Sequence, residues 1–534
     1  MRLRIAFSLG VVGLAVWALV QAPAPRSLAG YVPAGPMLYL EATDFAALER
    51  DWNGSAEKKL WLESSSYDVF SRSRLYERLA GAQAQYASAA GLPVDMPLVD
   101  AVAGGETALA IYDIGKLEFL YITRLPSARA MQSVLWRARG NYETRQAAGK
   151  DYFVRTDAES HRVAAFAATD EYLLIATRED LIPAALKLLS GAGGAAVTGE
   201  EWYSATVAAA GARGDLRMVM NMPALVHSPH FRSYWVQRNV SELRQYGGGI
   251  ADVFRSASEI REQRVLLRFS QPPPAAPGEA LGQALRLVPD DAGLYRAWAN
   301  PTPEAALNLL TARILAPQAQ AGRASEMAPE AQQSAAAGSE ADLETRIDEP
   351  PIENTGDRFV PDALRRLMES AKLEAMLEAA STRALADGVF VGIDSAVALL
   401  ASTDWNAEAV RDALSTAAET GPLGRIAFQA QGRVLVIGNS AALVRRMTAR
   451  IANPPQKTEG DYAAGFNPVR ERPNFERMTK LIDSSAGGDS REPHFFSENM
   501  ASLGRTLGRV NSSSILVRDS GRAVASTVVY RFGP

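Results

Sequence analysis

The sequence holds few side chains whose types and spacing suit catalysis, and one such group is a serine followed three residues later by a lysine. Ser55-Ala56-Glu57-Lys58 satisfies the S-x-x-K pattern, in which a lysine activates a serine nucleophile one helical turn away. The accompanying K-T-G motif is absent, because Lys457-Thr458 is followed by Glu459. The pattern therefore favours a chance match over an acylation site.

Two closely spaced histidines, His227 and His230, are the candidate metal ligands. A metal site would need at least one further ligand fixed by the fold, and Pro229 between them favours a loop over a helical H-x-x-H motif. The chain has no cysteine, which excludes thiolate zinc sites, iron–sulfur clusters and disulfides. These positions are predicted to be surface histidines, and no catalytic, cofactor-binding or metal-binding residue is assigned.

Phosphate-binding and hydrolase signatures are also missing from the sequence. It contains no G-x-S-x-G, G-x-x-x-x-G-K-[ST] or G-x-G-x-x-G motif, and its glycine clusters at 191–194 and 247–249 are typical of flexible joints. The arginine pairs Arg365-Arg366 and Arg445-Arg446 suit anion binding in principle, but a solvated helix face is favoured. No cofactor is predicted, and an enzymatic activity is left open but not favoured.

The elements around these residues occur twice. Strands are predicted over 163–168 and 172–176 and again over 426–430 and 433–437, each pair joined by a short turn and followed by a helix. Five residues of the first window recur as identical residues in the second, all at one constant offset. Phe166, Ala168, Leu173, Ile175 and Leu181 match Phe428, Ala430, Leu435, Ile437 and Leu443, in this order. Such self-similarity indicates an internal duplication.

Other segments of the two copies match as well. Val32-Pro33 and Leu38-Tyr39 recur as Val288-Pro289 and Leu294-Tyr295, each before a predicted strand and an alanine-rich helix that begins at Phe45 or Pro303. Strand pairs are predicted over 108–112 with 117–123, and over 389–393 with 397–401, followed by helices over 127–138 and 407–418. Near the end of each half, Asp215 and Asn221 match Asp461 and Asn467.

The predicted fold class is therefore α+β, with two duplicated halves at 31–271 and 280–534. Each half would contain antiparallel strand–strand–helix units and a smaller strand–helix–strand element. A proline-rich linker at 272–279 joins the halves. The second half carries an insertion at about 317–358 that has almost no large apolar residues and is predicted to be disordered.

The N-terminal segment decides the predicted compartment. Arg2 and Arg4 precede an uncharged run from Ile5 to Val20, so residues 1–30 are predicted to be a signal peptide or signal anchor. Ser27-Leu28-Ala29 is an acceptable cleavage site, but an uncleaved anchor is favoured. The two arginines favour a cytoplasmic N-terminus. We expect a single-pass membrane protein with its bulk in the periplasm, or a secreted periplasmic protein if the segment is cleaved.

Composition limits the partners. The chain has 534 residues and a formal net charge of −4, so no global field attracts a polyanion and nucleic acid is not expected as a partner. The lack of cysteine also excludes a lipid-modified bacterial N-terminus. The remaining predicted partners are the membrane, through the N-terminal helix, and another envelope protein or a cell-wall component.

The order of elements resembles a family of exported bacterial proteins, a domain of unknown function numbered thirty-three fifty-two. The resemblance is carried by the V-P-x-x-x-x-L-Y start at Val32, the strand after Gly104-Gly105-Glu106 and the strand at 172–177. The resemblance implies an envelope location but supplies no activity and no site residues. The favoured function is a non-enzymatic envelope scaffold or binding module. The alternative is a hydrolase or small-ligand-binding protein with its site in the cleft between the halves.

Overall fold

The structure is a computed structural model that describes residues 27–63, 67, 71, 74–229, 243–270, 279–315, 362–384, 390–420, 426–474 and 510–533. These residues form a mixed α+β protein with antiparallel strand pairing, as predicted. The chain divides into two compact units: unit 1 holds residues up to 46 and 83–204, and unit 2 holds 47–82 and 205 onward. The segments 1–26, 271–278 and 316–361 lie outside the described residues, and with them the predicted insertion and the predicted linker at 272–279 except for Glu279, which begins a helix.

Unit 1 contains one antiparallel sheet. Its strands, in spatial order, are β1 (Leu38–Ala42), β2 (Thr107–Asp113), β3 (Glu118–Arg124), β7 (Tyr172–Ala176), β6 (Val163–Ala168), β5 (Lys150–Thr156) and β4 (Glu143–Ala147). The strands β6 and β7 have the bounds that the sequence predicts.

The helical segments of unit 1 include its first described residues. The 3-10 helix η1 (Leu28–Tyr31) buries Leu28 and Ala29 completely, so the folded unit begins before the predicted cleavage point. The other segments are α6 (Met96–Val102), α7 (Ser127–Ala130), α8 (Val134–Arg137), η2 (Ala138–Asn141), α9 (Leu181–Ser190) and η3 (Val197–Gly199). Three helices belong in part to each unit: α2 (Phe45–Asn53), α5 (Arg74–Ala90) and α10 (Glu201–Ala209).

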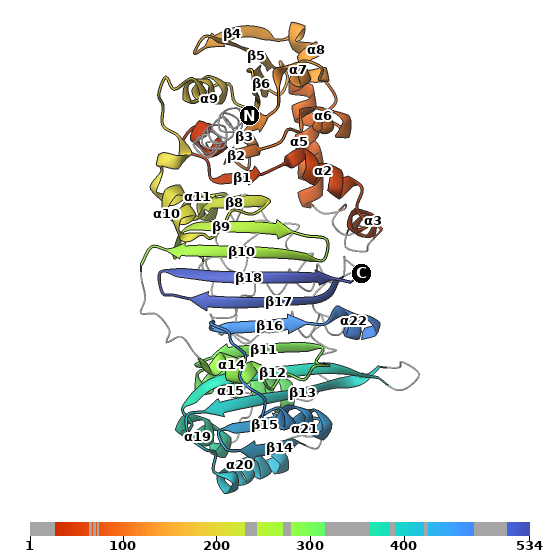
Figure 1. Ribbon diagram of the computed structural model, residues 1–534, viewed down its shortest axis with the longest axis vertical. Helices are drawn as coiled ribbons and strands as arrows, with labels where there is room; N and C mark the ends of the chain where they lie inside the picture. Colours follow the sequence, from red (N-terminus) through yellow and green to blue (C-terminus); the bar gives the residue numbers. More distant parts are fainter. Residues whose placement is uncertain are drawn as a thin grey trace, which may run out of the picture. The chain divides into compact units, whose positions relative to one another are not determined.

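Unit 2 contains a longer antiparallel sheet. Its spatial order is β8 (Leu216–Asn221), β9 (Tyr246–Arg255), β10 (Glu259–Arg268), β18 (Ala523–Phe532), β17 (Val510–Asp519), β16 (Tyr462–Phe466), β11 (Leu294–Ala299), β12 (Leu373–Ala384), β13 (Phe390–Ala401), β15 (Val434–Gly438) and β14 (Ala427–Gln431). Figure 1 shows β9, β10, β18 and β17 side by side in this order.

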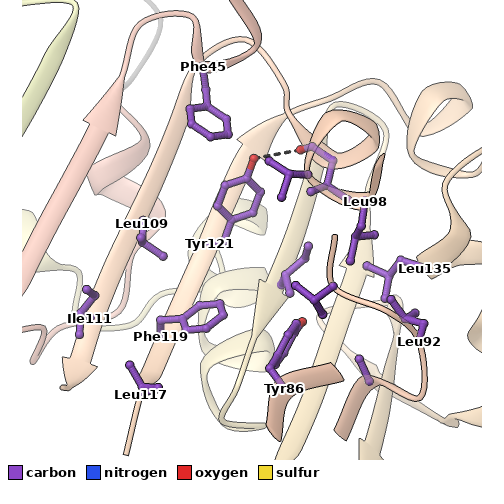
Figure 2. Close-up of a pocket in the computed structure, with 15 residues that line it drawn as sticks. Phe45, Tyr86, Leu92, Leu98, Leu109, Ile111, Leu117, Phe119, Tyr121 and Leu135 are labelled. Carbon is purple, nitrogen blue, oxygen red and sulfur yellow. Dashed lines mark hydrogen bonds between the residues drawn. The ribbon is translucent and has the colours of Figure 1, made fainter. Parts of the chain in front are cut away.

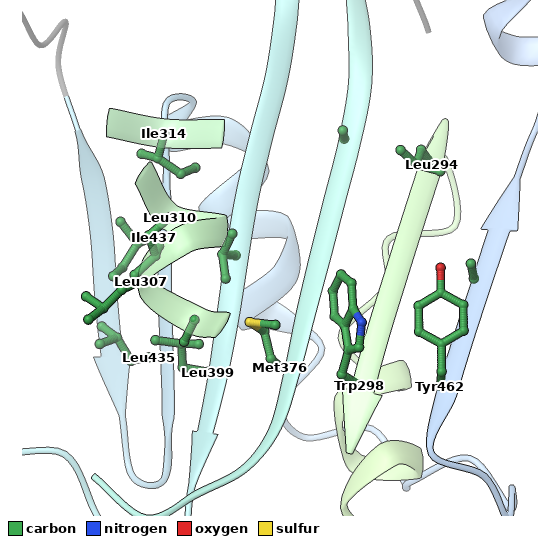
Figure 3. Close-up of a cluster of buried hydrophobic side chains, with 14 of the residues drawn as sticks. Leu294, Trp298, Leu307, Leu310, Ile314, Met376, Leu399, Leu435, Ile437 and Tyr462 are labelled. Carbon is green, nitrogen blue, oxygen red and sulfur yellow. The ribbon is translucent and has the colours of Figure 1, made fainter. Parts of the chain in front are cut away.

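Helices cover both faces of the β11–β13 region because its strands are apolar on both sides. Met376 and Leu399 belong to a core cluster with residues of α15 (Pro303–Leu310) and α19 (Asp362–Ser370), part of which Figure 3 shows. Their neighbours Leu377 and Leu400 face the opposite cluster with α14 (Glu279–Leu285) and α21 (Ala441–Ala449). The remaining helices are α3 (Ala56–Leu62), α11 (Met222–His227), η4 (Thr311–Leu315), α20 (Ala407–Thr420), α22 (Pro468–Glu471) and η5 (Arg472–Asn474).

Two sets of strands share one order of pairing. In unit 1 the order β1-β2-β3-β7-β6 is built from the hairpins β2–β3 and β6–β7, and in unit 2 the order β11-β12-β13-β15-β14 is built in the same way. The register agrees too. The pairing leads from Leu40 through Leu109 and Tyr121 to Ile175. From Arg296, the residue matched to Leu40, it leads through Glu378 and Val397 to Ile437, which is the residue matched to Ile175.

A second correspondence lies within unit 2, between β8-α11-β9-β10 and β16-α22-β17-β18. Asn221 and Asn467 each cap the helix that follows the first strand. Asp215 accepts a hydrogen bond from the Arg255 amide at 2.7 Å, and Asp461 accepts one from the Asp519 amide at 2.5 Å.

The hairpins that end these two runs also match. In each, the amide of a turn serine donates to a carbonyl three residues on, Ser256 to Glu259 and Ser520 to Ala523. The strands β10 and β18 then pair with one another, with Gln263 opposite Thr527 at the centre of the ladder.

Several predicted elements differ from the structure. The strands predicted over 389–393 and 397–401 are one continuous strand, β13, and its partner β12 is not among the predicted strands. The helix predicted over 127–138 is divided among α7, α8 and η2. The hairpin β4–β5 was also missed. Among the described residues, no helix has the length and apolar character needed to cross a membrane.

Candidate functional site

Unit 1 contains an apolar pocket between the β2–β3 hairpin and the chain from the end of α5 through α6 (Figure 2). Alternation along β2 places Leu109 and Ile111 on one face. The register places Tyr121 and Phe119 of β3 directly opposite them. These four side chains form one wall of the pocket.

Helix α6 and the end of α5 supply the other walls. Leu98, Val99 and Val102 of α6 line the cavity together with Tyr86 and Ala90 of α5. The cavity has a volume of about 380 Å³, within the range of roughly 300–1,000 Å³ that is usual for small-molecule sites. All its lining residues are apolar except for the hydroxyl groups of two tyrosines.

The end of α5 is fixed by hydrogen bonds to its last carbonyl groups. Arg155 donates to the carbonyl oxygens of Ser88 and Ala89, and the Tyr142 hydroxyl donates to that of Ala90 at 2.7 Å. Gly91 follows with a φ of 64°, which an L side chain adopts only at a cost. These contacts satisfy the unpaired carbonyls at the helix end and hold Tyr86, one turn earlier, in position.

Leu117, on the turn between β2 and β3, lines the pocket from a strained conformation. Its φ is 53°, in the left-handed region, which costs a non-glycine residue about 1–2 kcal/mol. The Thr177 hydroxyl donates to the Leu117 carbonyl at 2.8 Å and accepts from the Phe119 amide at 2.9 Å. Thr177 thus holds the turn that presents the Leu117 side chain to the cavity.

The two tyrosines of the pocket differ in their hydrogen bonding. The Tyr121 hydroxyl donates to the Val102 carbonyl at 2.9 Å, the contact drawn in Figure 2. The Tyr86 hydroxyl has no hydrogen-bond partner among the residues that the structure describes, and its ring packs on Phe119. Burial is the main cause that raises the pKa of both phenols above 10.0, so both remain neutral donors at physiological pH.

The S-x-x-K residues form a helix cap. Ser55 is the N-cap of α3, and its hydroxyl accepts from the Lys58 amide at 3.1 Å and donates to the Trp52 carbonyl at 2.8 Å. The Lys58 side chain bonds to Asn53. A serine that caps a helix accepts from the amide three residues later, which is the position of the lysine here. Helix capping therefore explains the spacing of Ser55 and Lys58 without a catalytic role.

The other candidate residues are dispersed. His227 ends α11, where it is exposed and its Nδ1 lies 2.6 Å from the Pro223 carbonyl, while His230 lies outside the described residues. In the described part of the chain, no group of three metal-ligating side chains comes together. Arg445 and Arg446 lie on the exposed face of α21.

The pocket was not predicted from the sequence. Its lining comes from segments far apart in the chain, and apolar residues that surround a cavity have the same pattern as residues that pack against one another. The left-handed conformation of Leu117 could not be predicted either, because leucine rarely adopts it and the residue type gives no signal for it. The predicted alternative of a site in the cleft between the halves stays a prediction.

Unit 2 holds a buried cluster of charges at the position that corresponds to the pocket wall. Glu378 of β12 is fully buried, and its Oε2 accepts from Arg296 Nε at 2.7 Å. Arg313 of η4 forms a second ion pair, with its Nε 2.9 Å from Glu378 Oε1. Arg296 also lies over the ring of Trp298, at 5.4 Å from the centroid. Among the described residues, the side chains of Arg296, Arg313 and Glu378 are all buried.

Comparison with known proteins gives little information about this site. No protein-family model and no curated protein sequence matches the chain. Among solved structures, crystal forms I and IV of a protein named TP0453 are similar to it over 46% of this chain and 80% and 81% of the other. Their sequence identities are 11% and 10%, and their TM-scores are 0.25 and 0.26.

Proposed function

We propose that this chain is a non-enzymatic envelope binding module whose ligand is an apolar molecule held in the pocket of unit 1. The observation that carries the proposal is a cavity of about 380 Å³ whose walls are apolar apart from two neutral phenols. Transfer of an apolar ligand from water into such a site is favourable by roughly 25 cal/mol per Å² of surface buried.

The contrast between the two sets of strands supports the proposal. We infer that the chain is an internal duplication, because the strand order, the register and the capping contacts recur. Leu109, which lines the pocket, then corresponds to Glu378, which is closed off by two arginines. In the second copy, ion-paired side chains therefore occupy the position that lines a cavity in the first copy. The shared arrangement of strands does not by itself require a cavity there.

The composition of the pocket argues for binding over catalysis. A nucleophile, general base or oxyanion site needs a side chain that changes charge or donates to a developing charge. The titratable groups that line the pocket are the two tyrosines, whose pKa values are raised above 10.0 by burial. They serve as neutral hydrogen-bond donors.

The proposed location is the periplasmic face of the membrane, with the N-terminal segment as an uncleaved anchor. The charge pattern of Arg2, Arg4 and the run from Ile5 to Val20 supports export. The burial of Leu28 and Ala29 in unit 1 supports the uncleaved form, because cleavage after Ala29 would remove both side chains from the core.

The test is a titration with N-phenylnaphthylamine, a neutral dye that fluoresces in apolar surroundings. Val99→Trp places a large ring in the cavity, and we expect it to weaken dye binding by at least about tenfold, which is ~1.4 kcal/mol. Val134→Trp is the matched control, because Val134 lies on α8 of the same unit with 40% exposure and does not line the pocket.

Circular dichroism would check that both variants fold. Equal loss of dye binding in both variants, or none in either, would contradict the proposal, because the dye would then be reporting a surface other than the pocket.

A further inference from the structure

We propose that the ligand is an uncharged single-chain lipid whose oxygen accepts a hydrogen bond from the Tyr86 hydroxyl. The inference rests on the proposed function of the pocket and deepens it by giving the class of ligand and the residue that selects it. Three features of the pocket lead to it: the unpaired hydroxyl, the lack of charge in the walls and the volume of the cavity.

The free hydroxyl is the first feature. Tyr86 is half-buried among the lining residues and, in the described part of the chain, its oxygen has no protein partner. Figure 2 shows its ring reaching from α5 into the group of apolar side chains. The Tyr86 oxygen is not among the fully buried atoms that lack a hydrogen bond, so water reaches it in the empty pocket. A ligand that displaces this water must supply an acceptor of its own, because the donor would otherwise become buried and unpaired. Tyr121 does not offer this contact, because its hydroxyl already donates to Val102.

The absence of charge is the second feature. The lining residues include no Lys, Arg or His, so a carboxylate or phosphate inside the pocket would lose its hydration without gaining a counterion. An alcohol or an ester carbonyl loses much less and accepts the same hydrogen bond. The pocket therefore selects a neutral oxygen over an anionic one.

The volume is the third feature. If a methylene group fills as much space as a water molecule does in the liquid, about 30 Å³, a cavity of about 380 Å³ holds a chain of about a dozen carbons. A single acyl or alkyl chain of that length fits, whereas a two-chain phospholipid exceeds the cavity.

The experiment is competition against bound N-phenylnaphthylamine by dodecanol and by dodecanoic acid, with the full chain. At neutral pH we expect dodecanol to displace the dye at lower concentration than dodecanoic acid does. The difference should shrink at a pH where the acid is protonated. Tyr86→Phe should lower the ratio of dodecanol affinity to dye affinity by roughly two- to tenfold, as the loss of one hydrogen bond to dodecanol does.

Tyr121→Phe is the matched control, since it removes a hydroxyl that lines the same pocket but is already paired. We expect it to leave the ratio of dodecanol to dye affinity as it is. An unchanged ratio of dodecanol to dye affinity in Tyr86→Phe, or tighter binding of dodecanoate than of dodecanol at neutral pH, would overturn this inference while dye binding still supports the pocket. Failure of the wild-type chain to bind the dye would instead overturn the proposed function.

Discussion

The negative charge of Glu378 neutralises two arginines in the core of unit 2, and the stability of the fold depends on it. Glu378 is fully buried between Arg296 and Arg313, and these two cations are themselves almost completely buried. Removal of the carboxylate would leave both arginines in the core without a counterion. A buried charge of this kind costs much more than the original pair contributes, because its hydration is lost and nothing replaces it.

We expect Glu378→Gln to lower the free energy of unfolding by about 3–5 kcal/mol in urea titrations. Glu374→Gln is the matched control on the same strand. Glu374 pairs with Arg433 at a site where both side chains are 37% exposed, and we expect a loss of about 0–1 kcal/mol there. Equal losses in the two variants would show that the buried cluster contributes no more than a surface pair.

The same cluster predicts a dependence of stability on pH. Burial opposes the ionisation of Glu378, but Arg296 and Arg313 outweigh it and hold its pKa below the ordinary value of 4.5. A carboxyl whose pKa is lowered by folding contributes its stabilisation above its unfolded pKa and loses it as the pH falls through the folded one. The wild-type stability should therefore drop below pH 4.5 more steeply than that of Glu378→Gln, as measured by urea midpoints across this range.

At the scale of elements, short helices are held at matching places by asparagine caps. The Asn221 side chain accepts from the Ala224 amide at 3.2 Å, and the Asn467 side chain accepts from the Arg470 amide at 3.0 Å. Each helix has a proline in its first turn, which suits a position where the amide has no partner. The cap and the proline together start α11 and α22 after their strands.

We expect Asn221→Ala and Asn467→Ala each to cost about 1 kcal/mol in thermal or urea unfolding. Replacement of either asparagine by serine should retain most of the stability, because serine is an equally good cap. A loss in the serine variants as large as in the alanine variants would point to a role for the asparagine other than capping.

The elements also show where sequence reasoning succeeds. The strands β6 and β7 were predicted with their observed bounds because they are short, apolar and separated by a polar turn. The strand β12 was missed because its alanine, leucine and glutamate residues favour helices, and pairing with β11 and β13 on both sides overrides this preference. The pocket could not be predicted, because the volume left between Leu109, Val99 and Tyr86 depends on packing that no spacing encodes.

At the scale of the whole molecule, the proposed ligand should act on one unit. The pocket lies in unit 1, and the corresponding strands of unit 2 carry a cluster of buried apolar side chains. A ligand that binds the folded state slows the local opening of the segments that surround it.

We expect dodecanol to slow amide hydrogen exchange in β2, β3 and α6, measured by mass spectrometry, and to leave β11, β12 and β13 unchanged. Val99→Trp should abolish the effect at the same dodecanol concentration. Protection centred on β12 and β13 would place the ligand in unit 2 and contradict the assignment of the site.

The pairing of β10 with β18 has a consequence for the ancestry of the chain. Counted from the matching turn serines Ser256 and Ser520, Gln263 corresponds to Thr527 under the proposed duplication. These two residues lie opposite one another, so the two strands meet about a local twofold axis. This is the geometry of an isologous homodimer contact, in which one surface binds a copy of itself. A half-length precursor would have assembled edge to edge with a second copy, and gene fusion would have made that association independent of protein concentration.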